Sequence, residues 1–432
     1  MLLPCLLQAH MLRVLPATTA RRVVQAQSPP PAAAGQRRPT LYVDVSVFSR
    51  HDAGTGIQRV VREVLAQLFK GPVESFTVVP VAATRRTGYQ TTALASDLAS
   101  GNSDQKPLYA GQPVSPVQGD VFLGLDLAAH LLPHHYPELL RWKRAGVSIQ
   151  MVVYDLLPAL WPDWFNPKAV KNFNAWLKAI AVFADRFHCI SSTVKAELTR
   201  WFQSNYAIAL NDQSVSVFPL GSNLAAARAA SQPVATSKPA DQNTLAFAQQ
   251  QPTTLMVGTI EPRKGHADVL AVFLELWRQG SVNQLVVVGA PGWKTEAVQQ
   301  ALTAAVATTH KLVWLQDADD HLLAQLYQAV SGVIVASRGE GFGLPLIEAA
   351  HYGKPVLARD IPVFREVARG TVTFFPDSPE GGLTPPALAA WLASCACPSP
   401  RAHYLPPSSL PDWATTTAVL LGNTGLTTAL SN

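Results

Sequence analysis

The stretch GVIVASRGEGFGLPLIEAA, residues 332–350, joins a short apolar run to a glycine-rich turn and a helix pattern. Its first five residues are apolar throughout, which is typical of a strand covered on both faces of a sheet. Three alternating glycines allow the turn to be tight and to approach a ligand closely, and Pro345 suits the first turn of a helix. The pattern therefore predicts a strand, a turn and a helix of a parallel α/β sheet. The three glycines are Gly339, Gly341 and Gly343.

The turn is also a candidate ligand site. Backbone amides from Gly343 to Leu346 would point out of the helix N-terminus, where an anion such as a phosphate binds. Glu340 in the loop and Glu348 about one turn into the helix frame this position. A carboxylate accepts two hydrogen bonds and therefore suits sugar hydroxyls. The alternative is two ordinary acids on a solvated helix face, but the strand–turn–helix setting favours the ligand site.

A second candidate site is VGTIEPRKGHADVL, residues 257–270. It follows an apolar run, and the next helix is expected to begin near Ala267. Arg263 and Lys264 occupy the turn between them. Arginine grips a diphosphate bidentately and lysine acts as a point charge. On spacing alone, a solvated basic turn explains this pair equally well.

Both halves of the chain alternate short β-branched runs with amphipathic stretches of helix length, which predicts parallel, doubly wound sheets. Ligands of such sheets bind at the carboxyl ends of the strands. Strands are predicted at 41–47, 75–82, 120–125, 147–153, 186–190 and 214–218, and at 254–258, 284–289, 311–315, 332–336, 355–358 and 371–375. Helices are predicted at 57–69, 168–184, 267–278, 295–308, 320–329 and 345–352.

The domain boundaries follow from composition. Residues 223–252 are rich in Ala, Gln, Ser and Pro and predict a linker. It separates a first domain, 40–222, from a second, 253–403, and the segment 404–432 is expected to return toward the first domain. Residues 1–39 carry arginines after their apolar start, which argues against a secretory signal. A disordered tail or an early start codon is the simplest interpretation, and an organelle-targeting segment is the alternative.

Charge and composition exclude several classes of protein. The net charge of +5 equals the five arginines of residues 1–39, so a nucleic-acid groove is not expected in the remainder. No apolar run approaches the ~20 residues of a membrane-spanning helix. Four cysteines do not predict a disulfide scaffold in 432 residues. A dinucleotide oxidoreductase would need G-x-G-x-x-G after the first strand, and it is absent.

With these two segments the chain resembles the retaining glycosyltransferases of the GT-B fold, family 4 or group 1, which include mannosyl- and rhamnosyltransferases of bacterial surface polysaccharide synthesis. The likeness covers about residues 40–420. It includes the segments 42–65, 152–165, 189–198, 218–223, 313–330 and 358–367. The resemblance implies an α/β, GT-B fold of two Rossmann-like domains facing across a cleft.

The resemblance also implies a role for each motif residue. Glu340 would contact hydroxyls of the transferred sugar, and Glu348 would hold the nucleotide ribose. Lys264, helped by Arg263, would neutralise the departing diphosphate. The donor-binding set would be completed by Gly258, Thr259, Gly341, Phe342, Gly343 and Leu344.

The first domain would supply the acceptor side through Gly54, Gly56, Arg59, Tyr154 and Asp155. Two positions depart from the family pattern. Thr259 stands where many relatives carry arginine. Either Arg263 carries more of the diphosphate, or Thr259 donates only a hydrogen bond to it. Tyr154 stands where relatives carry the histidine of an H-D pair.

The expected function is that of a retaining hexosyltransferase. It would move mannose or a similar sugar from a nucleotide-diphosphate donor such as GDP-mannose to a glycan or lipid-linked oligosaccharide. The alternative is a catalytically silent nucleotide-sugar-binding protein. No cofactor or metal is expected, because Asp317 and Asp319, the only D-x-D, precede a helix and suit capping. A cytoplasmic protein, peripheral at the inner membrane face, is expected. The sequence does not identify the sugar, the base or the acceptor.

Overall fold

The computed structural model describes most of the 432 residues and divides into two compact units. Unit 1 comprises residues 1–160, 167–220 and 413–432, and unit 2 comprises residues 161–166 and 221–412. The described residues are 2–30, 37–50, 52, 54–70, 75–92, 111–221, 239–369, 372–378, 382–396 and 411–426.

Unit 1 is built on a seven-stranded sheet in the order β3-β2-β1-β4-β5-β6-β7. All neighbouring strands are parallel except β2 and β3, which form an antiparallel pair. β1 and β4 are its central strands, and all four residues of β4 are buried, as an apolar run covered on both faces requires. The strands are β1 Thr40–Asp44, β2 Thr77–Ala82, β3 Gln90–Thr91, β4 Val121–Gly124, β5 Ser148–Val153, β6 Arg186–Cys189 and β7 Val215–Val217.

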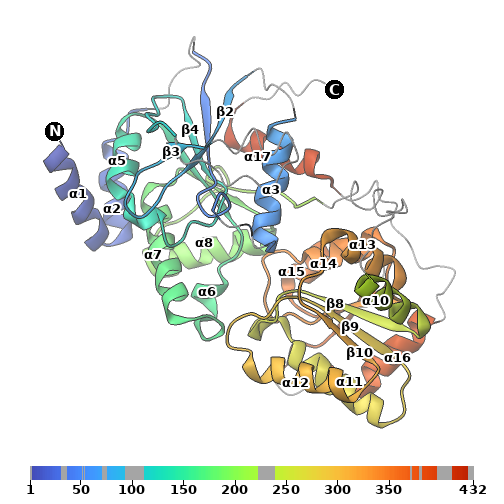
Figure 1. The fold of residues 1–432 in the computed structure, drawn as a ribbon. Helices are drawn as coiled ribbons and strands as arrows, with labels where there is room; N and C mark the ends of the chain where they lie inside the picture. The colour runs from blue at the N-terminus through green and yellow to red at the C-terminus, as the bar shows by residue number, and fades with distance from the viewer. Residues whose placement is uncertain are drawn as a thin grey trace. The chain divides into compact units, whose positions relative to one another are not determined.

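Helices cover both faces of this sheet. In Figure 1 α3 and α17 lie on one side of the strands and α5 lies on the other, and α7 packs beside α5. The α-helices are α1 Leu2–Val14, α2 Ala17–Ala26, α3 Gly56–Leu68, α5 Tyr136–Arg144, α6 Leu157–Leu160, α7 Pro167–Phe183, α8 Ser192–Tyr206 and α17 Trp413–Thr424, and η1 Leu132–His134 is a 3-10 turn.

Unit 2 has a six-stranded, all-parallel sheet in the order β10-β9-β8-β11-β12-β13. The order reverses next to β8, so the carboxyl ends of β8 and β11 flank the switch point where ligands of doubly wound sheets bind. The strands are β8 Thr253–Val257, β9 Gln284–Val288, β10 Leu312–Leu315, β11 Gly332–Val335, β12 Val356–Arg359 and β13 Val372–Phe375.

The core of unit 2 lies between its sheet and three helices. Phe273 of α11, Leu302 of α12 and Leu388 of α16 pack in one buried cluster with strand residues, and α10 packs against α13 (Figure 1). The helices are α10 Pro239–Gln250, α11 His266–Arg278, α12 Glu296–Thr308, α13 Asp320–Ala329, α14 Leu344–His351, α15 Pro362–Val367 and α16 Pro385–Ala396, with 3-10 turns at η2 Pro162–Trp164 and η3 Pro262–Lys264.

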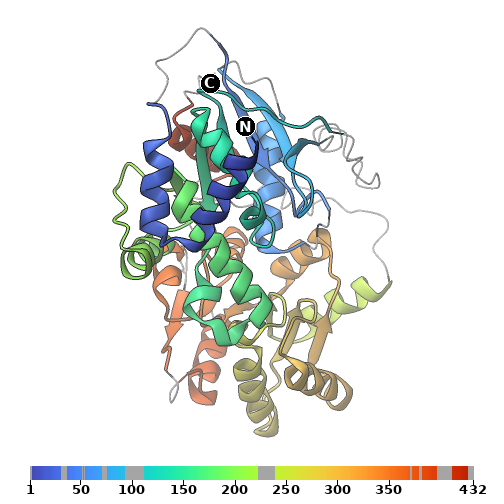
Figure 2. The same ribbon diagram turned by 90° about the vertical axis from the view of Figure 1, so that its left-hand side faces the viewer.

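The first residues of the chain are helical, which corrects the expectation of a disordered tail over residues 1–39. α1 packs on α5 and α2 packs on α7, as both views show (Figures 1 and 2). Leu12 and Val24 are each 1% exposed. Arg21 donates to the carbonyl oxygens of Ala181 and Ala184 at 2.7 and 2.9 Å. A low charge and a high alanine content are found in packed helices as well as in disordered tails. Composition alone therefore could not distinguish the two for residues 1–39.

The expected linker is also structured in part. Residues 239–250 form α10, whereas residues 223–238 lie outside the described part of the chain. At the other end, α17 belongs to unit 1 and packs on α3 and β6. None of the helices in the described residues has the length and apolar character that a bilayer span requires.

Candidate active site

An ion-pair cluster occupies the carboxyl ends of β8 and β11 in unit 2. Lys264 Nζ lies 2.6 Å from Glu340 Oε1, and Arg263 Nη1 lies 2.8 Å from Glu340 Oε2. Arg263 also donates from Nη1 to the Gly339 carbonyl at 3.0 Å, and its Nε lies 2.8 Å from Glu261 Oε2. The backbone joins the same two turns, because the Arg338 amide donates to the Arg263 carbonyl at 2.7 Å. The structure therefore brings together the three residues predicted to be catalytic.

The electrostatics of the cluster keep Glu340 ionised. Burial would raise the pKa of the Glu340 carboxyl, but the Arg263 and Lys264 charges and a hydrogen bond from Ser337 lower it to about 2. Glu340 is therefore a carboxylate that accepts hydrogen bonds and holds no proton to donate at neutral pH.

The turn between the cluster and α14 has the geometry that its glycines predict. Gly343 is the N-cap of α14 with φ of 105°, a conformation that side chains rarely adopt. A Cβ there would lie 2.8 Å from Phe364 Cε1. Gly341, Phe342 and Leu344 lie in or next to the same turn, so the predicted donor-binding residues of this segment gather at one helix N-terminus.

Glu348 lies farther along α14 and has its own partner. The Tyr327 hydroxyl donates to Glu348 Oε2 at 2.6 Å, and Tyr327 is 1% exposed and stacks on Tyr352. The carboxylate is thus held in place from the side of α13. Tyr327 was not predicted as a site residue, because a tyrosine within an amphipathic helix pattern indicates only packing.

The turn after β8 holds the remaining predicted donor residues. Gly258 ends the strand, and the Lys264 side chain passes close to it: a Cβ on Gly258 would lie 3.4 Å from Lys264 Cε. Thr259 is half-buried in the same turn. Gly265, which caps α11, has its Cα so near Ala336 that a Cβ would lie 2.5 Å from the Ala336 carbonyl oxygen. This close approach holds Lys264 against the loop that carries Glu340.

Two groups around the cluster were missed by the sequence analysis. His266 is 3% exposed, and burial together with the Lys264 charge lowers its pKa to about 3, so it is neutral. Asp268 Oδ2 accepts from both Arg338 and the fully buried Arg359, at 2.8 and 2.7 Å. Arg359 also donates to the Ala336 carbonyl at 2.9 Å. These contacts hold residues 336–338, at the start of the loop that carries Glu340. Sequence analysis could not show them, because the residues are far apart along the chain and meet only in the fold.

The acceptor-side residues expected from the resemblance lie in unit 1. Gly54 precedes α3, and its amide donates to Asp52 at 3.0 Å, while Gly56 and Arg59 lie in the first turns of α3. Asp155 accepts from the Leu157 amide at 3.1 Å, in the turn that leads into α6.

Tyr154 does not have the acceptor-side position that the resemblance implies. It is 3% exposed and its hydroxyl donates to the Leu125 carbonyl at 2.6 Å. A side chain that is buried and hydrogen-bonded in this way is part of the core of unit 1 and is not available to an acceptor.

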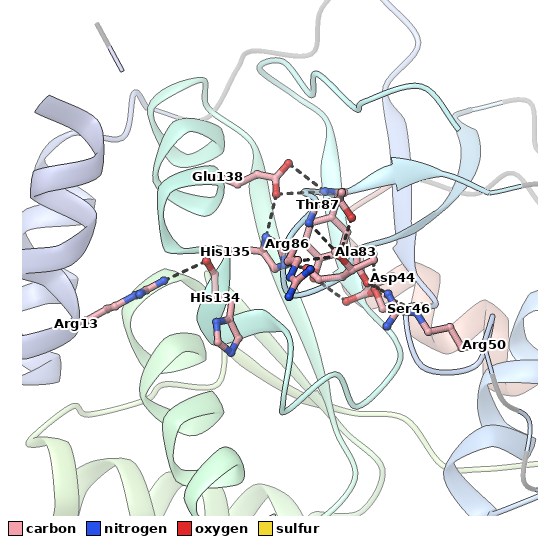
Figure 3. A network of polar contacts seen from close by, with 12 residues as sticks. Arg13, Asp44, Ser46, Arg50, Ala83, Arg86, Thr87, His134, His135 and Glu138 are labelled. Atoms are coloured by element: carbon pink, nitrogen blue, oxygen red, sulfur yellow. Dashed lines mark hydrogen bonds and ion pairs between the residues drawn. The ribbon is translucent and has the colours of Figure 1, made fainter. Parts of the chain in front are cut away.

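A polar network lies at the carboxyl edge of the unit 1 sheet (Figure 3). Asp44, at the end of β1, accepts from the Ser46 hydroxyl at 2.5 Å and from the Tyr89 hydroxyl at 2.8 Å. The neighbouring Asp126 accepts from the amides of Val47 and Phe48, each at 2.7 Å. The two carboxylates thus hold residues 46–48, at the start of the segment that leads to Gly54 and Gly56.

The D-x-D motif has the capping geometry. Asp319 is the N-cap of α13, and its carboxylate accepts from the Leu322 amide at 2.8 Å. Among the described residues no group of three or more His, Cys, Asp and Glu side chains is placed to hold a metal ion.

Two α/β units, each built on a largely parallel sheet, define the GT-B fold. A Lys–Arg–Glu cluster lies beside a helix N-terminus at the switch point of the second sheet. Residues 237–380, within unit 2, match the family model of the glycosyl transferases group 1. Solved structures agree on the fold. The chain is similar to HepE from Anabaena in complex with UDP and glucose, with a TM-score of 0.60, 14% identity and coverage of 90% of this chain and 100% of that one. Sucrose-phosphate synthase from Thermosynechococcus elongatus gives a TM-score of 0.61, 16% identity and coverage of 90% and 98%.

Among curated relatives, the chain is 39% identical to the serotype-specific mannosyltransferase WbdA of Escherichia coli over 355 residues. The match covers 82% of this chain and 41% of WbdA, so the chain spans about two fifths of the length of that relative. The O-antigen chain mannosyltransferase B of Escherichia coli is 30% identical over 26% of this chain and 30% of its own length.

Proposed function

We propose that this chain transfers a hexosyl group, mannose, from a nucleotide-diphosphate sugar to a hydroxyl of a glycan in surface polysaccharide synthesis, with retention of the anomeric configuration. The observation that carries the proposal is the partly buried Lys264–Glu340–Arg263 cluster at the switch point of the unit 2 sheet. The likeness to WbdA supports mannose and a polysaccharide product, and the resemblance to retaining enzymes supports retention.

Lys264 is the residue best suited to the diphosphate. An ammonium group has three hydrogen-bond donors, and one of them is taken by Glu340. The others remain for the oxygens of a leaving diphosphate, whose charge grows as the glycosidic bond breaks. Arg263 is more constrained, because it already contacts Glu340, Gly339 and Glu261. We therefore assign Arg263 mainly to holding the two turns together, and Lys264 to the diphosphate.

Glu340 would orient the transferred sugar. Because it is ionised at neutral pH, it acts as a hydrogen-bond acceptor for sugar hydroxyls rather than as an acid. Its charge would also stabilise the positive charge that develops on a sugar ring held there. Glu348, held by Tyr327, would accept from the ribose hydroxyls.

Transfer and retention can be tested together. The full chain is incubated with GDP-mannose or other nucleotide sugars and a mannose oligosaccharide, and the product is analysed by mass spectrometry and by the one-bond C–H coupling at the new anomeric carbon. We expect one hexose added in the same anomeric configuration as in the donor. Donor binding without transfer to any acceptor would favour the catalytically silent alternative, and inversion would overturn the retaining mechanism.

We propose further that catalysis is independent of divalent metal, because Lys264 and the N-terminus of α14 can stabilise the diphosphate. Activity is expected to survive EDTA. Loss on chelation with recovery on adding Mn²⁺ or Mg²⁺ would show that a metal takes part.

A peripheral contact with an anionic membrane is supported by α1. Leu7, Met11 and Val14 are 62%, 57% and 71% exposed and recur at helical spacing beside the exposed Arg13. Apolar side chains and a nearby cation suit the interface of an anionic bilayer. Flotation with phosphatidylglycerol vesicles should be lost in Met11→Glu and kept in Val306→Glu, which changes an exposed residue of α12. Equal flotation of the two variants would contradict the contact.

A further inference from the structure

Four aromatic side chains form a cluster on unit 2. Trp161 and Trp164 stack nearly parallel, with ring centroids 5.0 Å apart and an interplanar angle of 15°. Phe165 lies 5.9 Å from Trp293, centroid to centroid. Trp161 is 53% exposed and is the one aromatic among the exposed large hydrophobic side chains in the described residues. About half of the Trp161 side chain is therefore presented to solvent, while Trp164 stacks on its ring.

Hydrogen bonds fix this cluster in place. The Trp293 indole donates to the Trp164 carbonyl at 2.8 Å, and Lys294 Nζ donates to the Asp163 carbonyl at 2.8 Å. Stacking on Trp164 further restricts the Trp161 ring. The exposed ring is thus preorganised, which lowers the entropy lost when a ligand binds to it.

The cluster is joined to the turn of the candidate active site. Trp293 lies in the loop after β9, where the Ile260 amide donates to the Ala290 carbonyl at 2.9 Å. The Gly292 amide and the Thr295 hydroxyl both donate to the Ile260 carbonyl, at 3.0 and 3.1 Å. Ile260 is three residues from Arg263. The short turn after β8 therefore carries the two cations of the ion-pair cluster and also contacts the loop that holds Trp293.

We propose that Trp161, supported by Trp164 and Trp293, is a carbohydrate-binding subsite for the acceptor chain. Pyranose rings have an apolar face of C–H groups that packs on an indole face, while their hydroxyls require polar neighbours. The cluster offers both, because the exposed Asp163 and Lys294 flank the rings. A hydrophobic protein partner or a lipid core would not need such polar groups beside the exposed ring. The position beside the reaction turn fits sugar residues of a growing polymer that are not themselves reacting.

The inference rests on the proposed function and specifies its substrate. A subsite of this kind adds binding energy only for acceptors long enough to reach it. Longer mannose oligosaccharides should therefore have lower KM than mannose or a disaccharide, with similar kcat, because the contact is the same in the ground and transition states.

The test compares Trp161→Ala and Trp161→Phe with the wild type, and with Val306→Ala as a control on α12. Binding of mannose oligosaccharides of increasing length is measured by calorimetry, without donor, and transfer is measured with the same series. We expect Trp161→Ala to weaken binding of the long oligosaccharides by roughly 3- to 10-fold. Short acceptors, donor affinity and Val306→Ala should be unchanged, and Trp161→Phe should recover part of the loss.

Several outcomes would overturn the subsite. One is equal oligosaccharide binding by Trp161→Ala and the wild type, and another is an equal loss for short and long acceptors. A third is loss of vesicle binding without loss of sugar binding, which would assign Trp161 to a membrane surface. If the wild type bound long oligosaccharides through Trp161 but transferred no sugar from any donor, the proposed function would fail while the carbohydrate subsite stood.

Discussion

At the scale of single residues, the charges of the unit 2 cluster depend on one another. Glu340 is surrounded by Arg263, Lys264 and Ser337. Removing Glu340 takes from Lys264 its ion-pair partner, whereas removing either cation leaves Glu340 with the other one. Glu348 is different, because its partner Tyr327 is neutral. The two carboxylates are expected to respond differently to substitution.

We predict that Glu340→Gln lowers kcat by roughly 100-fold or more, because the sugar loses a charged acceptor in the transition state. The donor Kd should change little. Glu348→Gln should instead weaken donor binding, by about 10-fold for one lost charged hydrogen bond. Steady-state kinetics and calorimetry with donor separate the two effects, and thermal melts check that both variants fold. Wild-type kcat and KM in both variants would show that the loop has been assigned wrongly.

The pH dependence of stability gives a second test at this scale, in unit 1. Burial raises the pKa of Asp44 to about 7 against hydrogen bonds from Ser46 and Tyr89. A carboxyl whose folded pKa is raised contributes stability that is complete below pH ~4 and is lost as pH rises toward 7. The free energy of unfolding of the wild type, measured with urea, should therefore fall by up to ~1.4 kcal/mol per pH unit over this window. In Asp44→Asn this fall should be absent, because the amide does not titrate. Parallel pH profiles for the two proteins would show that Asp44 does not titrate there.

Local motifs pointed to some residues of the unit 2 cluster, whereas other residues around it are brought together only by the fold. Glu340 and Lys264 were predicted because each lies in a strand–turn–helix pattern. Arg359 and Asp268 were not, because 91 positions separate them and nothing local to either indicates the buried contact. Tyr154 was misassigned since its place in a motif indicated a ligand contact, whereas its hydroxyl is hydrogen-bonded within the core.

At the scale of elements, the strands were predicted well because buried parallel strands are apolar along their whole length. The run 284–289 matches β9, which is buried throughout. The two-residue strand β3 and the helices α1 and α2 were missed. β3 is too short for an alternation of apolar and polar residues to be recognised. The composition of α1 and α2 is compatible with a disordered tail as well as with packed helices.

The N-terminus of α14 can be tested as an element. Gly343→Ala should strain the backbone at φ of 105° and press a methyl group on Phe364, 2.8 Å away. We expect a loss of stability of about 1–3 kcal/mol and weaker donor binding. Gly280→Ala is the matched control, because Gly280 has φ of 91° but an added Cβ there meets no atom within 4 Å.

If Gly280→Ala and Gly343→Ala were equally destabilised and bound donor equally well, backbone strain alone would explain the effect. The close packing of this helix terminus would then have no part in donor binding.

At the scale of the whole molecule, the chain is two units of one architecture with additions at its ends. The additions are α1 and α2 before the first strand of unit 1, and α17, which returns to unit 1 after the last helix of unit 2. These helices make residues at both ends of the chain part of one folding unit.

A pair of substitutions in α1 tests its membership of unit 1. Leu12 is 1% exposed and Leu7 is 62% exposed on the same helix. Leu12→Ala should lower the free energy of unfolding by about 2–5 kcal/mol, whereas Leu7→Ala should change it by less than about 0.5 kcal/mol. Chemical denaturation of the full chain measures both. Two neutral substitutions would support a loosely attached segment.

The central claim is that the Lys264–Glu340 cluster is where a nucleotide sugar reacts. The most direct measurement is donor binding and sugar transfer by the wild type and by Lys264→Met, with Lys311→Met, a residue distant from this cluster in sequence, as the control. If the claim is correct, the wild type and Lys311→Met bind donor and add one sugar to a mannose oligosaccharide. Lys264→Met should fold but lose at least about 10-fold in donor affinity and nearly all transfer. Unchanged donor affinity and transfer in Lys264→Met would contradict it.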